Sequence, residues 1–142
     1  MTPIEVSSDP ARIDRAAVHA FLSGESTWAR GIDRARVERA LDASLCFGAF
    51  ADGAQIGFAR VITDGATFAY LCDVFVLPAW RGQGVARALL AAIDAHPQLQ
   101  GLRRLLLFTS DAHGLYARAG FTPLAHPERG MERLRTDLYT ST

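Results

Sequence analysis

Lysine is absent from this chain, and all fifteen basic residues are arginine. The absence excludes a Schiff-base lysine, a P-loop lysine and a lysine general base. Two cysteines, Cys46 and Cys72, are too few for a disulfide scaffold and lack metal-ligand spacing. We therefore expect a reducing, cytoplasmic setting and no bound metal.

Long apolar runs are also missing. The longest candidate, FAYLCDVFVLPAW, is interrupted by Asp73 and Pro78 and is too short to cross a bilayer. The first residues, MTPIEVSSDPAR, have no basic start followed by an apolar run, so they do not resemble a signal peptide. The sequence predicts a soluble protein without a membrane partner.

Net charge of either sign is lacking as well, because fifteen acidic residues balance the arginines and the pI is about 6.9. No overall field favours nucleic acid, so any anion site has to be local. With 142 residues, 49% of them hydrophobic, and no repeat or linker, the chain is expected to form a single domain over 1–142.

Hydrophobic periodicity and turn residues predict an α+β fold. Asp9 is expected to cap the first helix and Asp33 the second, and Asp52-Gly53 marks a hairpin turn. The expected order is βααβββαβαββ: strand 4–7, helices 9–22 and 33–43, strands 45–51, 55–63 and 67–77, helix 81–96, strand 102–109, helix 111–118, and strands near 121–124 and 131–138.

Two glycines, Gly82 and Gly84, stand directly before the third long helix in PAWRGQGVARALL. A strand, a glycine turn and a helix N-terminus together present free amides to an anion such as phosphate. Alternatively, glycine at a helix entrance can be present only because the turn needs a backbone conformation that other residues disfavour, without any ligand. A P-loop is excluded without lysine, and a dinucleotide fingerprint fails because Arg87 occupies its third glycine position.

Two segments in the expected order resemble the GNAT superfamily of N-acetyltransferases. The stretch VLPAWRGQGVARALL is similar to its coenzyme A loop, whose pattern [QR]xxGx[GA] is met by Arg81, Gly84 and Ala86. Downstream, AHGLYARAGFTPL resembles its short helix that carries a tyrosine and ends in GF. The resemblance implies a three-layer, mixed and mostly antiparallel sheet of six or seven strands flanked by four helices.

The resemblance also implies a binding mode for acetyl-CoA. Its pyrophosphate would lie on the loop amides, and its pantetheine arm along the exposed edge of strand 71–77. Thr109 stands where the superfamily often has asparagine, so a hydroxyl would replace the usual amide contact. The implied cofactor-binding residues are Val74, Val76, Arg81, Gly82, Gln83, Gly84, Val85, Ala86, Arg87 and Thr109.

Tyr116 matches the superfamily's usual tyrosine, which protonates the departing thiolate, although it could also be a packed core residue. Asp73 lies in an apolar strand, where an unpaired buried carboxylate would be costly. It is therefore either a general base that faces a cleft or a structural aspartate with a partner. Strand alternation predicts that Cys72 points away from Asp73, into the core.

The loop 23–32 falls where the superfamily builds its acceptor pocket, so Glu25, Trp28 and Arg30 are candidate substrate contacts. Trp28 could stack on a substrate or simply cover the core. The sequence thus predicts acetyl transfer from acetyl-CoA to a primary amine of a small molecule or peptide. The alternative is a non-catalytic acyl-CoA sensor, and pairing into a homodimer is left open.

Overall fold

The computed structural model describes residues 2–139, and its strands form one five-stranded sheet with four α-helices. The strands are β1 (Glu5–Ser7), β2 (Leu45–Ala51), β3 (Ala54–Thr63), β4 (Phe68–Val76) and β5 (Arg104–Leu107). The helices are α1 (Arg15–Gly24), α2 (Arg34–Asp42), α3 (Val85–Ala95) and α4 (His113–Arg118). These nine elements follow the first nine of the predicted order.

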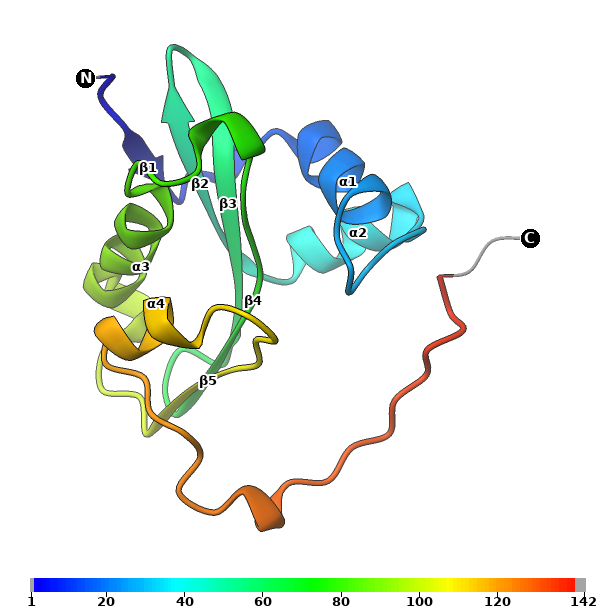
Figure 1. Ribbon diagram of the computed structural model, residues 1–142, viewed down its shortest axis with the longest axis vertical. Coiled ribbons are helices and arrows are strands. Elements are labelled where there is room, and N and C mark those ends of the chain that lie inside the picture. The colour runs from blue at the N-terminus through cyan, green and yellow to red at the C-terminus, as the bar shows by residue number, and fades with distance from the viewer. Residues whose placement is uncertain (1, 140–142) are drawn as a thin grey trace.

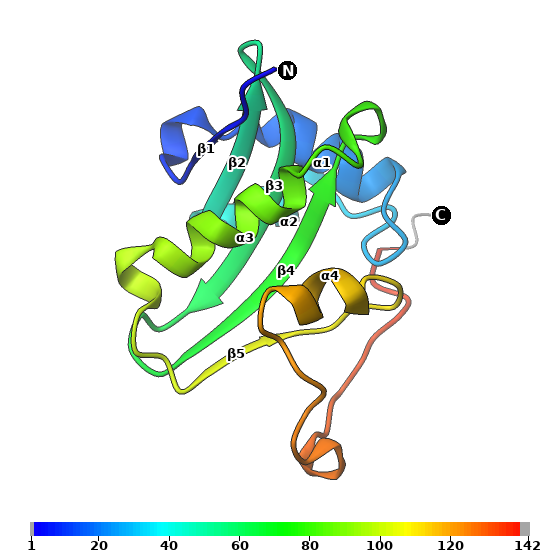
Figure 2. The same cartoon turned by 60° about the vertical axis from the view of Figure 1, so that its left-hand side comes forward.

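The strands lie side by side in chain order, β1 to β5. Neighbours from β1 to β4 are antiparallel, whereas β4 and β5 are parallel and are joined by the α3 crossover. Helices α1 and α2 cover one face of the sheet and α3 lies on the other (Figures 1 and 2), which gives the expected three layers. Each face has its own apolar core, around Phe58 and Phe75 under α1 and α2, and around Phe47 and Leu89 under α3.

The first helix begins later than the sequence predicts. Asp9 caps only a 3₁₀ turn over Pro10–Arg12, and the side chain of Asp14 accepts a hydrogen bond from the Ala17 amide to start α1. Both aspartates are good N-caps, so local sequence could not decide between them. Asp33 caps α2 as predicted, through the Arg36 amide.

Strand β4 carries a β-bulge near its middle. Arg60 of β3 pairs with Cys72 and Phe58 pairs with Phe75, so one residue of β3 faces two of β4. Asp73 adopts a φ of +52° in the bulge. The pairing between β4 and β5 ends just before it, at Leu71 and Leu107. Beyond that point the two strands diverge, because a bulge bends the strand that contains it.

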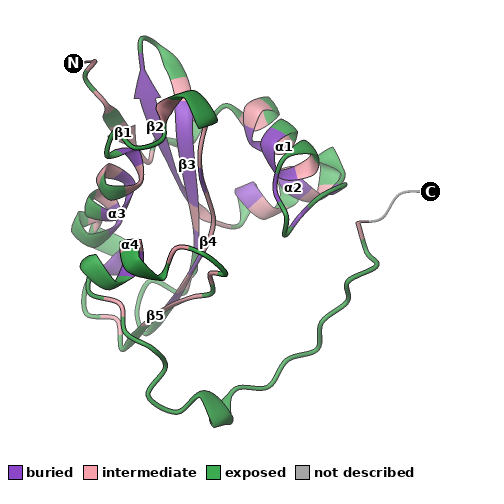
Figure 3. Ribbon diagram, viewed as in Figure 1, coloured by how far each residue is buried: buried purple, intermediate pink, exposed green. Residues whose placement is uncertain are grey.

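The two strands predicted near 121–124 and 131–138 are absent from the described chain, so the sheet has five strands rather than six or seven. Pro123 and Pro127 lack an amide donor, and the segment leaves the sheet instead of pairing with β5. It forms an exposed arm, drawn green along its length in Figure 3. No helix within residues 2–139 is long and apolar enough to cross a membrane.

Candidate active site

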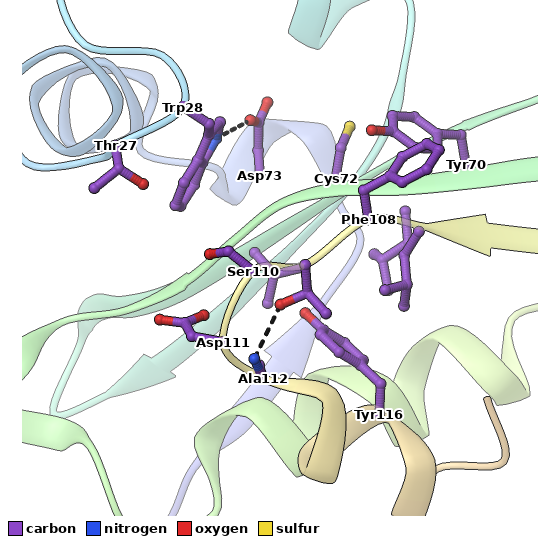
Figure 4. A pocket seen from close by; sticks show the side chains of 14 residues that line it. Thr27, Trp28, Tyr70, Cys72, Asp73, Phe108, Ser110, Asp111, Ala112 and Tyr116 are labelled. Atoms are coloured by element: carbon purple, nitrogen blue, oxygen red, sulfur yellow. Dashed lines mark hydrogen bonds between the residues drawn. The ribbon is translucent and has the colours of Figure 1, made fainter. Parts of the chain in front are cut away.

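A cavity of about 590 Å³ opens where β4 and β5 diverge. Figure 4 shows its side chains converging from the α1–α2 loop, β4, β5 and the start of α4. Its lining combines aromatic rings, hydroxyls and two carboxylates, and none of the described residues in it is basic. These residues are Thr27, Trp28, Tyr70, Leu71, Cys72, Asp73, Val74, Leu107, Phe108, Thr109, Ser110, Asp111, Ala112 and Tyr116.

The bulge places two consecutive residues of β4 in this cavity. In a regular strand Cys72 and Asp73 would face opposite sides of the sheet, but here both line the same space. The prediction that Cys72 points into the core was therefore wrong. Burial raises the pKa of the Cys72 thiol to about 12, so the thiol stays protonated and is a poor nucleophile at neutral pH.

Asp73 has two side-chain partners, one for each carboxylate oxygen. Trp28 donates its indole Nε1–H to Oδ1 at 2.8 Å, and Arg60 donates Nε–H to Oδ2 at 2.8 Å. The side chains of Arg60 and Asp73 are only 17% and 11% exposed, so water screens this ion pair weakly. Arg60 also donates to the Ser44 hydroxyl at 3.0 Å. The aspartate therefore has a structural partner, and its role as a base stays a prediction.

Sequence analysis missed Arg60, although the same signal that singled out Asp73 applied to it. It is a charged residue within the apolar run of β3, directly opposite Cys72. An arginine and an aspartate in neighbouring apolar strands are natural partners, because each neutralises the charge of the other and so offsets part of the free-energy cost of burying it. The exposed or half-buried Tyr70, Phe108, Ser110 and Asp111 carried no comparable signal.

The α1–α2 loop is held in shape by a buried serine. Ser26 donates its hydroxyl to the Leu22 carbonyl at 2.6 Å and accepts the Ala29 amide at 3.0 Å. This turn holds Trp28 over the cavity with 51% of its surface exposed. Of the three predicted substrate contacts, only Trp28 lines the cavity. Glu25 is exposed where α1 ends, and the Arg30 guanidinium donates instead to the Gly24 carbonyl at 3.1 Å.

Tyr116 rises from α4 toward the point of divergence, and its hydroxyl faces the cavity in Figure 4. The residue is buried, with 8% of its surface exposed, and Phe121 packs edge-on against its ring. Burial and, to a lesser extent, the charge of Asp111 raise its pKa above the ordinary value of a phenol. Within residues 2–139 no group hydrogen-bonds to its hydroxyl. The phenol is therefore protonated at neutral pH and free to donate.

Thr109 shapes the entrance to α4. Its hydroxyl accepts the Ala112 amide at 3.1 Å, whereas Asp111, the first residue of the predicted helix, accepts no such bond within the described chain. On the opposite wall Val74 lines the cavity, while the Val76 carbonyl accepts the Arg81 Nε–H at 3.1 Å. The structure thus places Thr109 and Val74 at the cavity, and it places Val76 beside the glycine loop.

The glycine loop leads from the end of β4 into α3. Gly82 and Gly84 have φ values of +76° and +84°, which side chains disfavour, and a Cβ at either would meet no described atom within 4 Å. The glycines are therefore required by backbone conformation, and the space above them is open. Val85 is buried, so only its amide can serve a ligand, whereas Gln83 and Arg87 are exposed and Ala86 is half-buried. The free N-terminal amides of this eleven-residue helix suit a phosphate group.

Comparison with known proteins gives this fold and site a family. The family model of the acetyltransferase (GNAT) domain matches residues 42–123, which include the hairpin, the glycine loop and Tyr116. A protein of Gibberella zeae named as an acetyltransferase is 34% identical over 135 residues, covering 80% of this chain and 75% of its own. The chain belongs to the GNAT acetyltransferase family.

Two further matches extend this comparison. The crystal structure of a protein from Xanthomonas campestris pv. campestris, assigned to the GNAT family, has 56% identity and a TM-score of 0.95, covering 99% of both chains. An aminoglycoside N(6')-acetyltransferase of Stenotrophomonas maltophilia is 35% identical over 83 residues, covering 50% of this chain and 54% of its own. The GNAT family uses acetyl-CoA. The open space above Gly82 and Gly84 is compatible with the pyrophosphate of that coenzyme.

Proposed function

We propose that this protein transfers the acetyl group of acetyl-CoA to a primary amine of a small molecule or peptide, with Tyr116 as general acid. The observation that carries the proposal is the free Tyr116 hydroxyl, which faces the cavity between β4 and β5. The glycine loop follows β4 after a single 3₁₀ turn over Pro78–Trp80, so a coenzyme whose pyrophosphate lies there can extend its arm along this strand to the cavity.

The reaction needs a neutral amine, a correctly placed thioester and a proton for the leaving sulfur. The amine nitrogen attacks the thioester carbon, the carbon–sulfur bond breaks, and the thiolate takes the Tyr116 proton. The raised pKa of Tyr116 keeps that proton available at neutral pH. The proton lost by the amine passes to water, directly or through Asp73, the predicted base, and solvent then returns a proton to the tyrosine.

The cavity favours a cationic acceptor. Asp73 and Asp111 line it, whereas Arg60 lies behind Asp73 and is not part of the lining. Trp28 and Phe108 expose 51% and 70% of their surface and can bind an apolar body or a cation. The similarity to an aminoglycoside N-acetyltransferase over half of the chain supports an amine acceptor.

The test combines ligand binding with turnover. Acetyl-CoA and CoA, but not ATP or NAD, are expected to raise the melting temperature, because a ligand that binds the native state stabilises it. Release of the CoA thiol is then followed with a panel of primary amines. Tyr116→Phe should lower kcat about 100-fold and leave coenzyme affinity nearly unchanged, as expected for loss of a general acid.

Tyr70→Phe is the comparison variant, because it removes a hydroxyl from the same cavity on the β4 side. We expect a much smaller loss of kcat from it. Stabilisation by CoA without turnover of any amine would favour the alternative function, an acyl-CoA sensor. Full activity of Tyr116→Phe with an accepted amine would contradict the assignment of the acid.

A further inference from the structure

The α1–α2 loop carries Trp28 to the cavity between β4 and β5, so the position of this loop decides what the cavity presents to an acceptor. Hydrogen bonds within the loop and to the end of α1 hold its shape. At its base the Gly31 amide donates to the Ser23 carbonyl at 2.9 Å. Local bonds of this kind define a fold for the loop, but its position over the sheet depends on contacts made from outside it.

The far end of the described chain makes such a contact. Tyr139 packs against the apolar core beneath α1 and α2, to which Ala29 and Ile32 of the loop also belong. The backbone of Tyr139 lies directly against Gly31, where an added Cβ would overlap the Tyr139 carbonyl oxygen. Figure 2 shows this red segment beside the blue loop. Gly31 also has a φ of +86°, so the backbone conformation and the contact both require glycine.

The Tyr139 ring is held at the start of α2. The Arg36 guanidinium lies 5.4 Å from its ring centre, within the range of a cation–π contact. Arg36 is itself fixed, because its amide donates to the Asp33 carboxylate at 3.0 Å and its guanidinium lies 3.8 Å from the same group. Asp33 is the N-cap of α2, where the loop ends. Tyr139 therefore joins the loop to the first turn of the helix that follows it.

This contact is an isolated one in the last part of the described chain. Every residue from 122 to 138 is exposed, and Tyr139 is the first residue after Phe121 that is not. Bringing a long exposed segment back to one place on the body restricts its conformations and costs chain entropy. The packing of Tyr139 offsets part of that cost, and it does so at the loop that carries Trp28.

We propose that Tyr139 is a positioning residue for the α1–α2 loop, and that its docking keeps Trp28 over the cavity for binding of the amine. The inference rests on the proposed transfer of acetyl groups to an amine. The loop is fixed on two sides, at Trp28 by the hydrogen bond to Asp73 and at Gly31 by Tyr139. The glycine loop enters α3, on the other face of the sheet, so coenzyme binding should not depend on Tyr139.

The kinetic test removes the ring. Tyr139→Ala should raise KM for an accepted amine several-fold, change kcat little and leave the Kd of CoA unchanged, because only the amine side of the cavity depends on the loop. Tyr139→Phe keeps the ring that packs on the core and on Arg36, so it should retain the wild-type KM. Leu134→Ala is the matched control: it shortens a side chain of the same segment that is 70% exposed, and should leave all three constants unchanged.

The fluorescence of Trp28 tests the loop without any substrate. The chain has two tryptophans, so Trp80→Phe leaves Trp28 as the only indole. In that background Tyr139→Ala should lower the steady-state anisotropy of Trp28 and increase its quenching by acrylamide, because a loop released at Gly31 moves more. Tyr139→Phe and Leu134→Ala should change neither quantity. Far-UV circular dichroism verifies that each variant is folded.

An unchanged anisotropy in Tyr139→Ala would overturn the inference, whatever the activity. A lower anisotropy with an unchanged KM for the amine would also overturn it. So would a rise in the Kd of CoA as large as the rise in KM, which would indicate a general loosening of the fold. Failure of the wild-type protein to acetylate any amine would contradict the proposed function instead, and the anisotropy would still show whether Tyr139 holds the loop.

Discussion

Neutralising Asp73 separates its two candidate roles, because Asp73→Asn removes the charge and the basicity while keeping an oxygen that can accept the Trp28 indole hydrogen. Breaking one side of a fully buried ion pair costs about 3–5 kcal/mol. The pair here retains 17% and 11% side-chain exposure, so a discounted cost of about 2 kcal/mol is appropriate. For a chain of 142 residues this corresponds to a fall in melting temperature of about 6 °C.

Both carboxylate oxygens of Asp73 already accept hydrogen bonds. We therefore expect Asp73 to position Trp28 rather than to act as the general base. Asp73→Asn should then raise KM for the amine several-fold, change kcat little and leave the pH profile of kcat/KM unaltered. The matched control is Asp52→Asn, which makes the same change at an exposed turn residue with the same φ of +52°. An unchanged melting temperature together with a 100-fold loss of kcat would refute this reasoning and identify Asp73 as the base.

Two further predictions concern the loop and the thiol. Gly84→Val should weaken CoA binding at least 10-fold, measured by calorimetry, since a β-branched residue disfavours a φ of +84°. The control is Gly65→Val, at a φ of +73° in the β3–β4 turn, which should leave CoA binding unchanged. If both variants bound CoA with the same affinity, a phosphate site at the glycine loop would be excluded. Burial raises the pKa of Cys72 to about 12, so its thiol should react with a disulfide reagent at pH 8 far more slowly in the folded protein than in denaturant. Equal reaction rates in the two states would show that the thiol is not buried as described.

Sequence patterns predicted the parts of this fold that depend on local signals. The β2–β3 hairpin follows from Asp52-Gly53 between alternating segments, and α3 follows from its glycine entrance and apolar stripe. The two C-terminal strands were predicted wrongly. Alternating apolar and polar residues show that a segment can pair as a strand, but they do not show whether the segment lies beside a free edge of the sheet. Likewise the choice between Asp9 and Asp14 as the cap of α1 depends on tertiary packing.

In the candidate site, too, residues marked by a local pattern were predicted and those that depend on the three-dimensional arrangement were missed. The loop glycines, Tyr116 and Trp28 were found because a motif or a loop position marked them. The position of Cys72 was missed because a bulge shifts the phase of a strand, and a single extra residue leaves no trace in the apolar pattern of β4. Arg60 could have been found by asking which residue would neutralise a carboxylate placed in an apolar strand.

The bulge in β4 also limits which changes of chain length the fold can accept. Deleting one residue at position 73 would make β4 a more regular strand and let its pairing with β5 continue past Leu71 and Leu107. The cavity would close, and Trp28 would lose its anchor on the sheet. The same deletion would leave the mostly buried Arg60 without its carboxylate partner, so the ion pair that stabilises β3 and β4 also preserves the bulge that opens the cavity.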